Sequence, residues 1–101
     1  MDVARMETKP VYLWSGGHEN SRPDPVFLRV QNQEEDDVRY LLDWSAPLRA
    51  LMVEFCARRG FPCDAVRFTY NGARVPEAKS AEDLGMDDGD VMDAWANQLG
   101  G

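Results

Sequence analysis

One amphipathic helix, expected at residues 48–59, is the strongest structural signal in this 101-residue sequence. Apolar residues recur there at i, i+3, i+4 and i+7 and form one stripe: Leu48, Leu51, Met52 and Phe55. Ser45 is a typical N-cap residue and Pro47 suits the first turn, so the helix is expected to begin at this point. Two arginines followed by Gly60, which favours the left-handed C′ position, indicate its end. The helix must bury its stripe against other elements.

Alternating apolar residues predict that those other elements are strands. They are expected at residues 26–30, 38–44 and 66–70, where apolar residues alternate, and at 73–75 and 91–95, which follow turn signals. Asn71-Gly72 and Asp88-Gly89 are turn signals, and Ser80 to Asp83 resembles a capping box that starts a short helical turn. The order β-β-α-β-β-(short helix)-β predicts an α+β roll, in which one main helix covers one face of a mixed sheet of four or five strands. This layout is the β-grasp.

The remaining segments are expected to be tails. Residues 1–25 have few apolar residues and several prolines and glycines, which is typical of a flexible N-terminal tail. The exception is Val11-Tyr12-Leu13-Trp14, which is too short to decide between an edge strand, a docked segment and no order. We therefore expect one folded domain at residues 26–96, followed by an extended C-terminal tail at 97–101.

Composition argues against several functions. The formal net charge of −7 disfavours nucleic acid as a partner, and no apolar run is long enough to span a membrane. Cys56, Cys63 and His18 lack the spacing of zinc ligands, and nothing would hold His18 against either thiol for catalysis. A small thiol enzyme has only the two cysteines in its favour. We expect a soluble, monomeric intracellular protein with no metal or cofactor, which is not an enzyme.

The sequence ends in Gly100-Gly101 after a short polar segment. Glycine has no Cβ, so this backbone can lie extended in a tunnel too narrow for side chains. Enzymes that activate or cleave the C-terminus of a protein need such a segment. A linker remnant would leave the same two residues, so the residues before them must decide.

Four segments carry a recognisable pattern: Phe55-Cys56-Ala57-Arg58-Arg59-Gly60, Tyr70-Asn71-Gly72-Ala73-Arg74-Val75, Leu84-Gly85-Met86-Asp87-Asp88 and Gln98-Leu99-Gly100-Gly101. With them, residues 26–101 resemble the small ubiquitin-related modifier (SUMO) family, which has a ubiquitin-like β-grasp fold. The sequence is divergent within that pattern. Leu99 and Trp95 replace the usual Thr and Tyr, and Leu41 and Asp43 stand where basic residues are common.

The resemblance implies a protein modifier rather than a catalyst. The Gly101 carboxylate would be adenylated, passed to a thiol as a thioester, and joined to a target lysine as an isopeptide. The implied partners are activating and conjugating enzymes, SUMO-type proteases and target proteins, in the nucleus and cytoplasm. The alternative is a SUMO-like non-covalent interaction module, one half of a tandem protein, that is poorly conjugated.

The resemblance also implies two binding surfaces. A groove between the second strand and the helix would take the short hydrophobic motifs of partner proteins as an added strand. Its residues would be Val38, Tyr40, Leu41, Leu42, Leu51, Phe55 and Arg58, although most of these also suit a plain core. Because Leu41 and Asp43 replace basic rim residues, we expect a weak preference for motifs with acidic flanks. The second surface would contact the conjugating enzyme, or else be a solvated charged face: Arg67, Gly72, Arg74, Asp87, Asp88 and Asp90.

Overall fold

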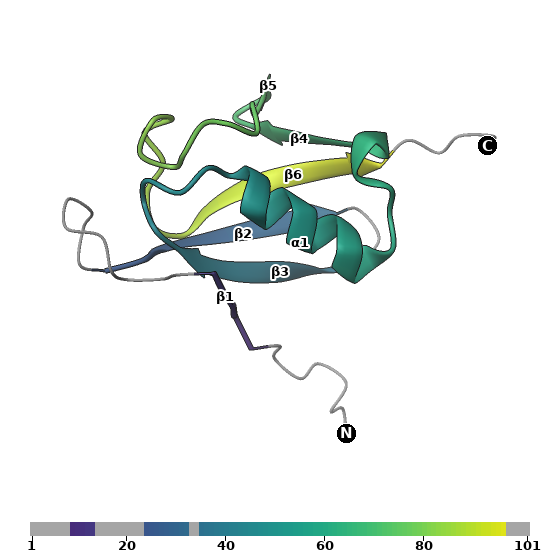
Figure 1. Cartoon of the computed structure of the whole chain (residues 1–101), viewed down its shortest axis with the longest axis horizontal. Coiled ribbons are helices and arrows are strands. Elements are labelled where there is room, and N and C mark those ends of the chain that lie inside the picture. Colours follow the sequence, from purple (N-terminus) through teal and green to yellow (C-terminus); the bar gives the residue numbers. More distant parts are fainter. Residues whose placement is uncertain (1–8, 14–23, 33–34, 97–101) are drawn as a thin grey trace.

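The computed structural model describes residues 9–13, 24–32 and 35–96. Its elements are β1 (Val11–Leu13), β2 (Val26–Asn32), β3 (Glu35–Leu42), α1 (Arg49–Arg59), the 3-10 helix η2 (Cys63–Ala65), β4 (Val66–Tyr70), β5 (Ala73–Arg74) and β6 (Asp90–Ala96). The strands form one sheet in the order β1-β3-β2-β6-β4-β5, and α1 lies across one face of it (Figure 1). The predicted β-grasp fold is confirmed.

The sheet is mixed in the way that this fold requires. β2 and β3 form an antiparallel pair, and β6 lies beside β2 in the parallel direction. β4 then runs antiparallel to β6. The first and last strands of the 26–96 domain therefore lie side by side at the centre, and β3 is brought to the flank that carries the predicted groove.

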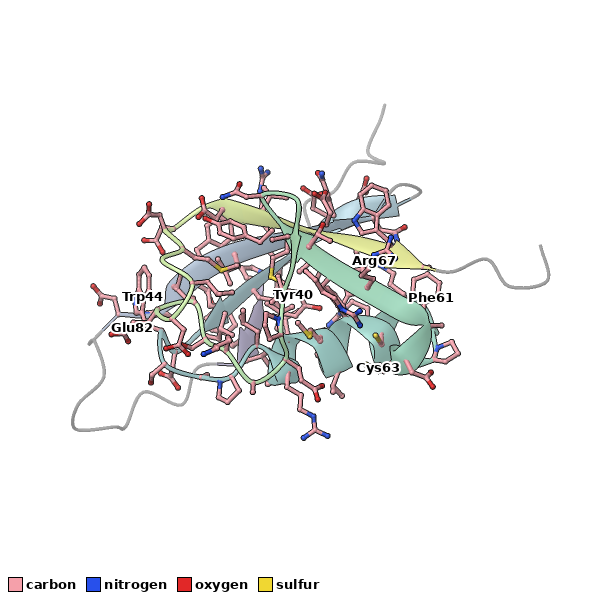
Figure 2. All side chains as sticks on the ribbon, turned by 90° about the horizontal axis from the view of Figure 1, so that it is seen from above. Tyr40, Trp44, Phe61, Cys63, Arg67 and Glu82 are labelled. Carbon is pink, nitrogen blue, oxygen red and sulfur yellow. The ribbon has the colours of Figure 1, made fainter. Side chains whose placement is uncertain are left out.

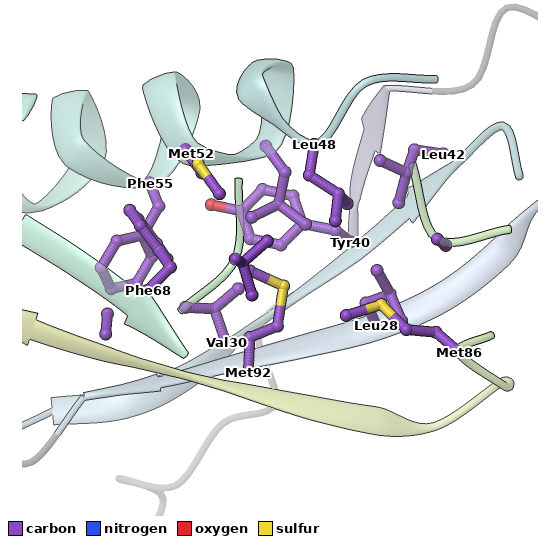
Figure 3. Packing of buried hydrophobic residues seen from close by; sticks show 14 of the residues in the cluster. Leu28, Val30, Tyr40, Leu42, Leu48, Met52, Phe55, Phe68, Met86 and Met92 are labelled. Carbon is purple, nitrogen blue, oxygen red and sulfur yellow. The ribbon is translucent and has the colours of Figure 1, made fainter. Parts of the chain in front are cut away.

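The core lies between α1 and the sheet. Side chains alternate along β2, so that Val26, Leu28 and Val30 are all 0% exposed. Phe55 reaches down from the helix to Phe68 of β4, with ring centroids 5.9 Å apart in an edge-to-face arrangement (Figure 3). The predicted helical stripe is buried along its whole length: Leu48, Leu51, Met52 and Phe55.

The sequence prediction is wrong about the start of the helix and right about its end. Ser45 is not the N-cap: it lies in a turn closed by the Ala46 N–H on the Asp43 carbonyl, and the cap position is Leu48. Pro47 forms an isolated bridge with Ser80, which delays the start of the helix. At the other end the prediction is confirmed, because Gly60 is left-handed at φ 77° and the N–H of Phe61 closes the helix on the Cys56 carbonyl.

The predicted turns form. Asn71 and Gly72 both have positive φ, at 54° and 84°, as a tight hairpin turn between β4 and β5 requires. Ser80 and Asp83 exchange reciprocal hydrogen bonds of 3.0 and 3.1 Å, which is the capping-box pattern. The segment that follows is a hydrogen-bonded turn at residues 81–85.

The N-terminal segment contains a strand. Of residues 1–25, which the sequence predicts to be a flexible tail, residues 11–13 form β1. This strand joins the flank of the sheet beside β3, in parallel (Figure 1). The sheet therefore has six strands instead of the expected four or five.

We predict that Phe55→Ala will lower the free energy of unfolding by about 3–5 kcal/mol, because the fully buried ring leaves a cavity under the helix. Val53→Ala is the matched control on the same helix. Its side chain is 47% exposed, so its effect should stay within about 0.5 kcal/mol. Urea denaturation of both variants measures the difference, and equal losses would contradict this assignment of the core.

Candidate functional site

The predicted groove residues divide into core and rim. Tyr40, Leu42, Leu51 and Phe55 are 0% exposed and belong to the core between β3 and α1. Val38 and Leu41 are half-buried, and Arg58 is exposed. Leu41 lies between two inward-facing residues of β3, so its side chain is on the outer face of the sheet. The surface that a partner strand would use is therefore the edge of β3 opposite β2, together with the rim along the helix.

Tyr40 ties this rim to the helix. Its hydroxyl donates a 2.6 Å hydrogen bond to Oε1 of Glu54. Arg58, one turn further along α1, donates to both carboxylate oxygens of Glu54, at 3.2 and 2.6 Å. Figure 3 shows the Tyr40 oxygen pointing toward α1. Glu54 was not among the predicted site residues, although its i,i+4 spacing from Arg58 is a signal that could have identified it.

The network shifts the pKa values of its members. Burial raises the pKa of the Tyr40 phenol, and its hydrogen bond to Glu54 adds to this effect. Burial alone would raise the pKa of Glu54, but the hydrogen bonds from Arg58 and Tyr40 outweigh it and lower the pKa below the usual range. Glu54 is thus held as a carboxylate, and it compensates the charge of Arg58. The groove has less positive rim charge than the sequence suggests.

The other rim positions do not restore that charge. Leu41 pairs with Tyr12 of β1, and Asp43 is buried at 6% exposure. Arg39 is half-buried and pairs across the sheet with Arg29, which lies 3.7 Å from the carboxylate of Asp37. Of these two arginines, Arg29 therefore has its charge compensated by Asp37.

The groove edge is occupied by β1. Val11 pairs with Tyr40, and Leu13 with Leu42. Both aliphatic side chains pack against the hydrophobic core. Tyr12, between them, is 66% exposed. The sequence did not decide whether the segment from Val11 to Trp14 is ordered, because it is too short to show a period.

The structure separates the residues of the predicted enzyme-binding surface. Arg67 pairs with Trp95 near the end of β6, whereas Asp90 begins that strand. Trp95 is five residues after Asp90 along the strand, a distance of about 17 Å. Figure 2 shows Arg67 on β4. The acidic residues and Gly72 lie toward one end of β4 and β6, and Arg67 lies toward the other.

The acidic turn at residues 87–90 is held by its own carboxylates. Asp88 accepts a 2.9 Å hydrogen bond from the N–H of Phe27 at the start of β2. Asp90 accepts from the Tyr70 hydroxyl at 2.6 Å and from the N–H of Asp87 at 2.9 Å. These contacts give Asp88 and Asp90 structural roles, while the exposed Asp87 presents negative charge to solvent.

The remaining candidate residues are a diglycine, two thiols and a histidine. Gly100, Gly101 and His18 lie outside the described residues. Burial raises the pKa of the Cys56 thiol to about 12, with a further contribution from the neighbouring Cys63 thiol. Cys56 is therefore a neutral core residue at pH 7, because only a thiolate is nucleophilic. Figure 2 shows Cys63 beside the C-terminal part of the helix.

Two further findings concern only the part of the chain that the structure describes. It contains no group of three or more His, Cys, Asp or Glu side chains that could hold a metal ion. It also contains no helix with the length and apolar character needed to cross a lipid bilayer.

The fold defines the class of protein. The structure of a ubiquitin from Caldiarchaeum subterraneum superimposes with a TM-score of 0.69, and the match covers 76% of this chain and 99% of that one. The sequences are 23% identical, so this likeness concerns the fold alone. The chain has the ubiquitin-like fold.

Sequence comparison narrows the class to a family. Residues 26–95 match the family described as ubiquitin-2 like Rad60 SUMO-like. Small ubiquitin-related modifier 3 of Arabidopsis thaliana is 43% identical over 76 residues, which cover 75% of this chain and 68% of that protein. The chain belongs to the SUMO-like family of ubiquitin-like proteins, whose members are modifiers and not enzymes.

We predict that Glu54→Gln will lower the free energy of unfolding by about 1 kcal/mol at pH 7. Because the pKa of Glu54 is lowered on folding, its contribution is present above the unfolded pKa and is lost as the pH falls through the folded pKa. The two proteins should therefore converge in stability as the pH is lowered below the usual range of Glu.

Urea denaturation at pH 7 and at acidic pH measures this convergence. Glu77→Gln is the control, because the Arg49–Glu77 pair is 3.9 Å apart and both side chains are 68% exposed, so its loss should have little effect. A difference between wild type and Glu54→Gln that does not depend on pH would contradict the charged state of Glu54.

Proposed function

We propose that this protein is a modifier of the SUMO type, joined through the Gly101 carboxylate to lysine amines of target proteins. The observation that carries the proposal is the family membership of residues 26–95, combined with the sequence Gln98-Leu99-Gly100-Gly101 after the last strand. The diglycine would be the attachment point whether or not further residues follow it before processing.

The chemistry assigned to this chain is that of a substrate. An activating enzyme would adenylate the Gly101 carboxylate with ATP and release pyrophosphate. An enzyme thiol would then displace AMP to give a thioester, and a target lysine would displace that thiol to give an isopeptide. SUMO-type proteases would hydrolyse the isopeptide with water, which restores the Gly101 carboxylate and the free lysine amine. The folded body supplies recognition surfaces, and the proposed site of action is the nucleus and cytoplasm.

We further assign the β3–α1 groove to hydrophobic interaction motifs of partner proteins. Such a motif adds a strand to β3, whose edge supplies main-chain hydrogen bonds, and places alternate side chains toward the helix. Glu54 compensates Arg58, and Leu41 and Asp43 supply no positive charge. Motifs with acidic flanks therefore gain little from this rim.

The acidic turn is the proposed contact for a basic surface of the conjugating enzyme. Of its carboxylates, Asp88 and Asp90 also hold the turn in shape, through Phe27 and Tyr70. Charge complementarity there would mainly raise the association rate and the specificity. Arg67, Gly72 and Arg74 complete the proposed surface, with Arg67 at its far end.

Replacing the last glycine tests conjugation. We predict that the wild-type protein, incubated with SUMO activating enzyme and ATP, forms a thioester that is visible on a non-reducing gel and is lost on reduction. Gly101→Ala should reduce this product by at least about tenfold, because a side chain must enter a channel shaped for glycine. Val53→Ala, on the exposed side of α1, is the control and should react like the wild type.

The other outcomes distinguish the two functional hypotheses. Undiminished thioester formation by Gly101→Ala would contradict attachment through this residue. If the wild-type protein forms no thioester while a known modifier reacts in the same mixture, the non-covalent interaction module is the better hypothesis. Leu99, which replaces the usual Thr, would be the first residue to revert in that case.

Charge selectivity tests the groove. We predict that two hydrophobic-motif peptides, one with acidic and one with serine flanks, shift NMR resonances of β3 and α1 with affinities within about threefold of each other. Glu54→Gln removes the negative charge that compensates Arg58, so this variant should bind the acidic peptide more tightly than the serine peptide. Sub-micromolar binding of the acidic peptide to the wild type would contradict the weak preference.

A further inference from the structure

The groove proposed for partner motifs already contains a strand of this chain. β1 lies along the free edge of β3 in parallel, with Val11 opposite Tyr40 and Leu13 opposite Leu42. These two side chains pack on the core from the groove side, while Tyr12 is 66% exposed on the outer face. This alternation of two inward aliphatic residues around an outward one is what the groove would require of an external motif.

β1 is an addition to a complete domain. The family match begins at residue 26, so β1 lies outside it. All the residues of the buried core lie between positions 26 and 94, so β1 contributes none of them. Without β1, β3 would be the edge strand, with main-chain donors and acceptors open to another chain.

The connection to β2 allows β1 to reach the groove of its own domain. Leu13 and Val26 both pair with Leu42, so they lie at the same end of the sheet on either side of β3. Two strand spacings separate them, or about 10 Å. The linking residues 14–25 can span about 40 Å when extended, so the intramolecular arrangement needs no strain.

The pairing is also weak enough to open. β1 has three residues, it pairs on one side only, and its direction is parallel, which is the less stable of the two ladder types. Short elements of this kind open locally at much lower free energy than the core. A tethered segment nevertheless has a high effective concentration at its own groove, so an external peptide must compete with it.

We propose that β1 is an internal occupant that masks the β3–α1 groove, and that a hydrophobic motif of a partner protein binds by displacing it. This inference concerns the proposed binding of partner motifs in the groove, and it rests on that proposed function for its biological use. The apparent affinity for an external motif is then the affinity of the open groove multiplied by the fraction of molecules in which β1 has opened.

Two full-length variants separate the inward from the outward side chains of β1. Val11→Ser combined with Leu13→Ser removes both core contacts and should release the strand. Tyr12→Ser changes only the exposed residue between them and is the matched control. NMR spectra of β4 and β6 confirm that each variant remains folded.

Two labelled peptides serve as probes by fluorescence anisotropy. One has the sequence of residues 9–14 of this chain, and the other carries Val-Ile-Val-Ile between serine flanks. We expect the first peptide to bind the double variant at least about tenfold more tightly than it binds the wild type or Tyr12→Ser, which corresponds to β1 being docked about nine-tenths of the time. The second peptide should follow the same order.

The outcomes distinguish failure of this inference from failure of the proposed function. If the residue 9–14 peptide binds the double variant more tightly and the Val-Ile peptide binds none of the proteins, the masking by β1 is supported. The proposed binding of partner motifs in the groove is then contradicted. If the residue 9–14 peptide binds all three proteins equally, or none, masking is overturned. A wild-type dimer that dissociates in the double variant would place β1 in the groove of a second copy, which would overturn the intramolecular arrangement.

Discussion

The burial of one helical stripe against one face of the sheet is the interaction on which this structure depends. Phe55 and Leu51 enter the core from α1 and meet inward residues of β2, β3 and β4. Because strands have a period of two, this burial also fixes which residues of each strand face solvent. The position of α1 along β3 thereby defines the rim of the groove. The same packing of α1 on the sheet therefore forms the core and positions the candidate site.

Tyr40 shows how closely the two are linked. Its ring is fully buried, but its hydroxyl reaches Glu54 at the rim, where Arg58 also binds. A buried phenol needs a hydrogen-bond acceptor, and a carboxylate supplies a strong one. The acceptor that satisfies the core is the group that compensates the charge of Arg58 at the rim. Selectivity for partners is in this way set partly by a requirement of folding.

Local patterns predicted most of the fold. Alternation located the strands β2, β3 and β4, and turn signals located β5 and β6. Gly60 and Asn71-Gly72 marked a helix end and a turn because these backbone conformations demand such residues. The misplaced N-cap and β1 have a common cause. Ser45 is displaced by the bridge from Pro47 to Ser80, and β1 is held by β3, so both depend on contacts distant in sequence. The placement of Arg67 at the far end from Asp90 is likewise set by strand pairing.

A protein that offers a sheet edge to its partners has to manage that edge when no partner is bound. Open strand edges promote association between copies, and charged residues or a covering segment are the usual remedies. Here Leu41 supplies no charge on β3, and Tyr12 of β1 lies beside it. A covering strand protects the edge without altering its residues, but every partner must then compete with it. Weak pairing is the physical compromise between the two demands, because a longer β1 would protect the edge and close the groove permanently.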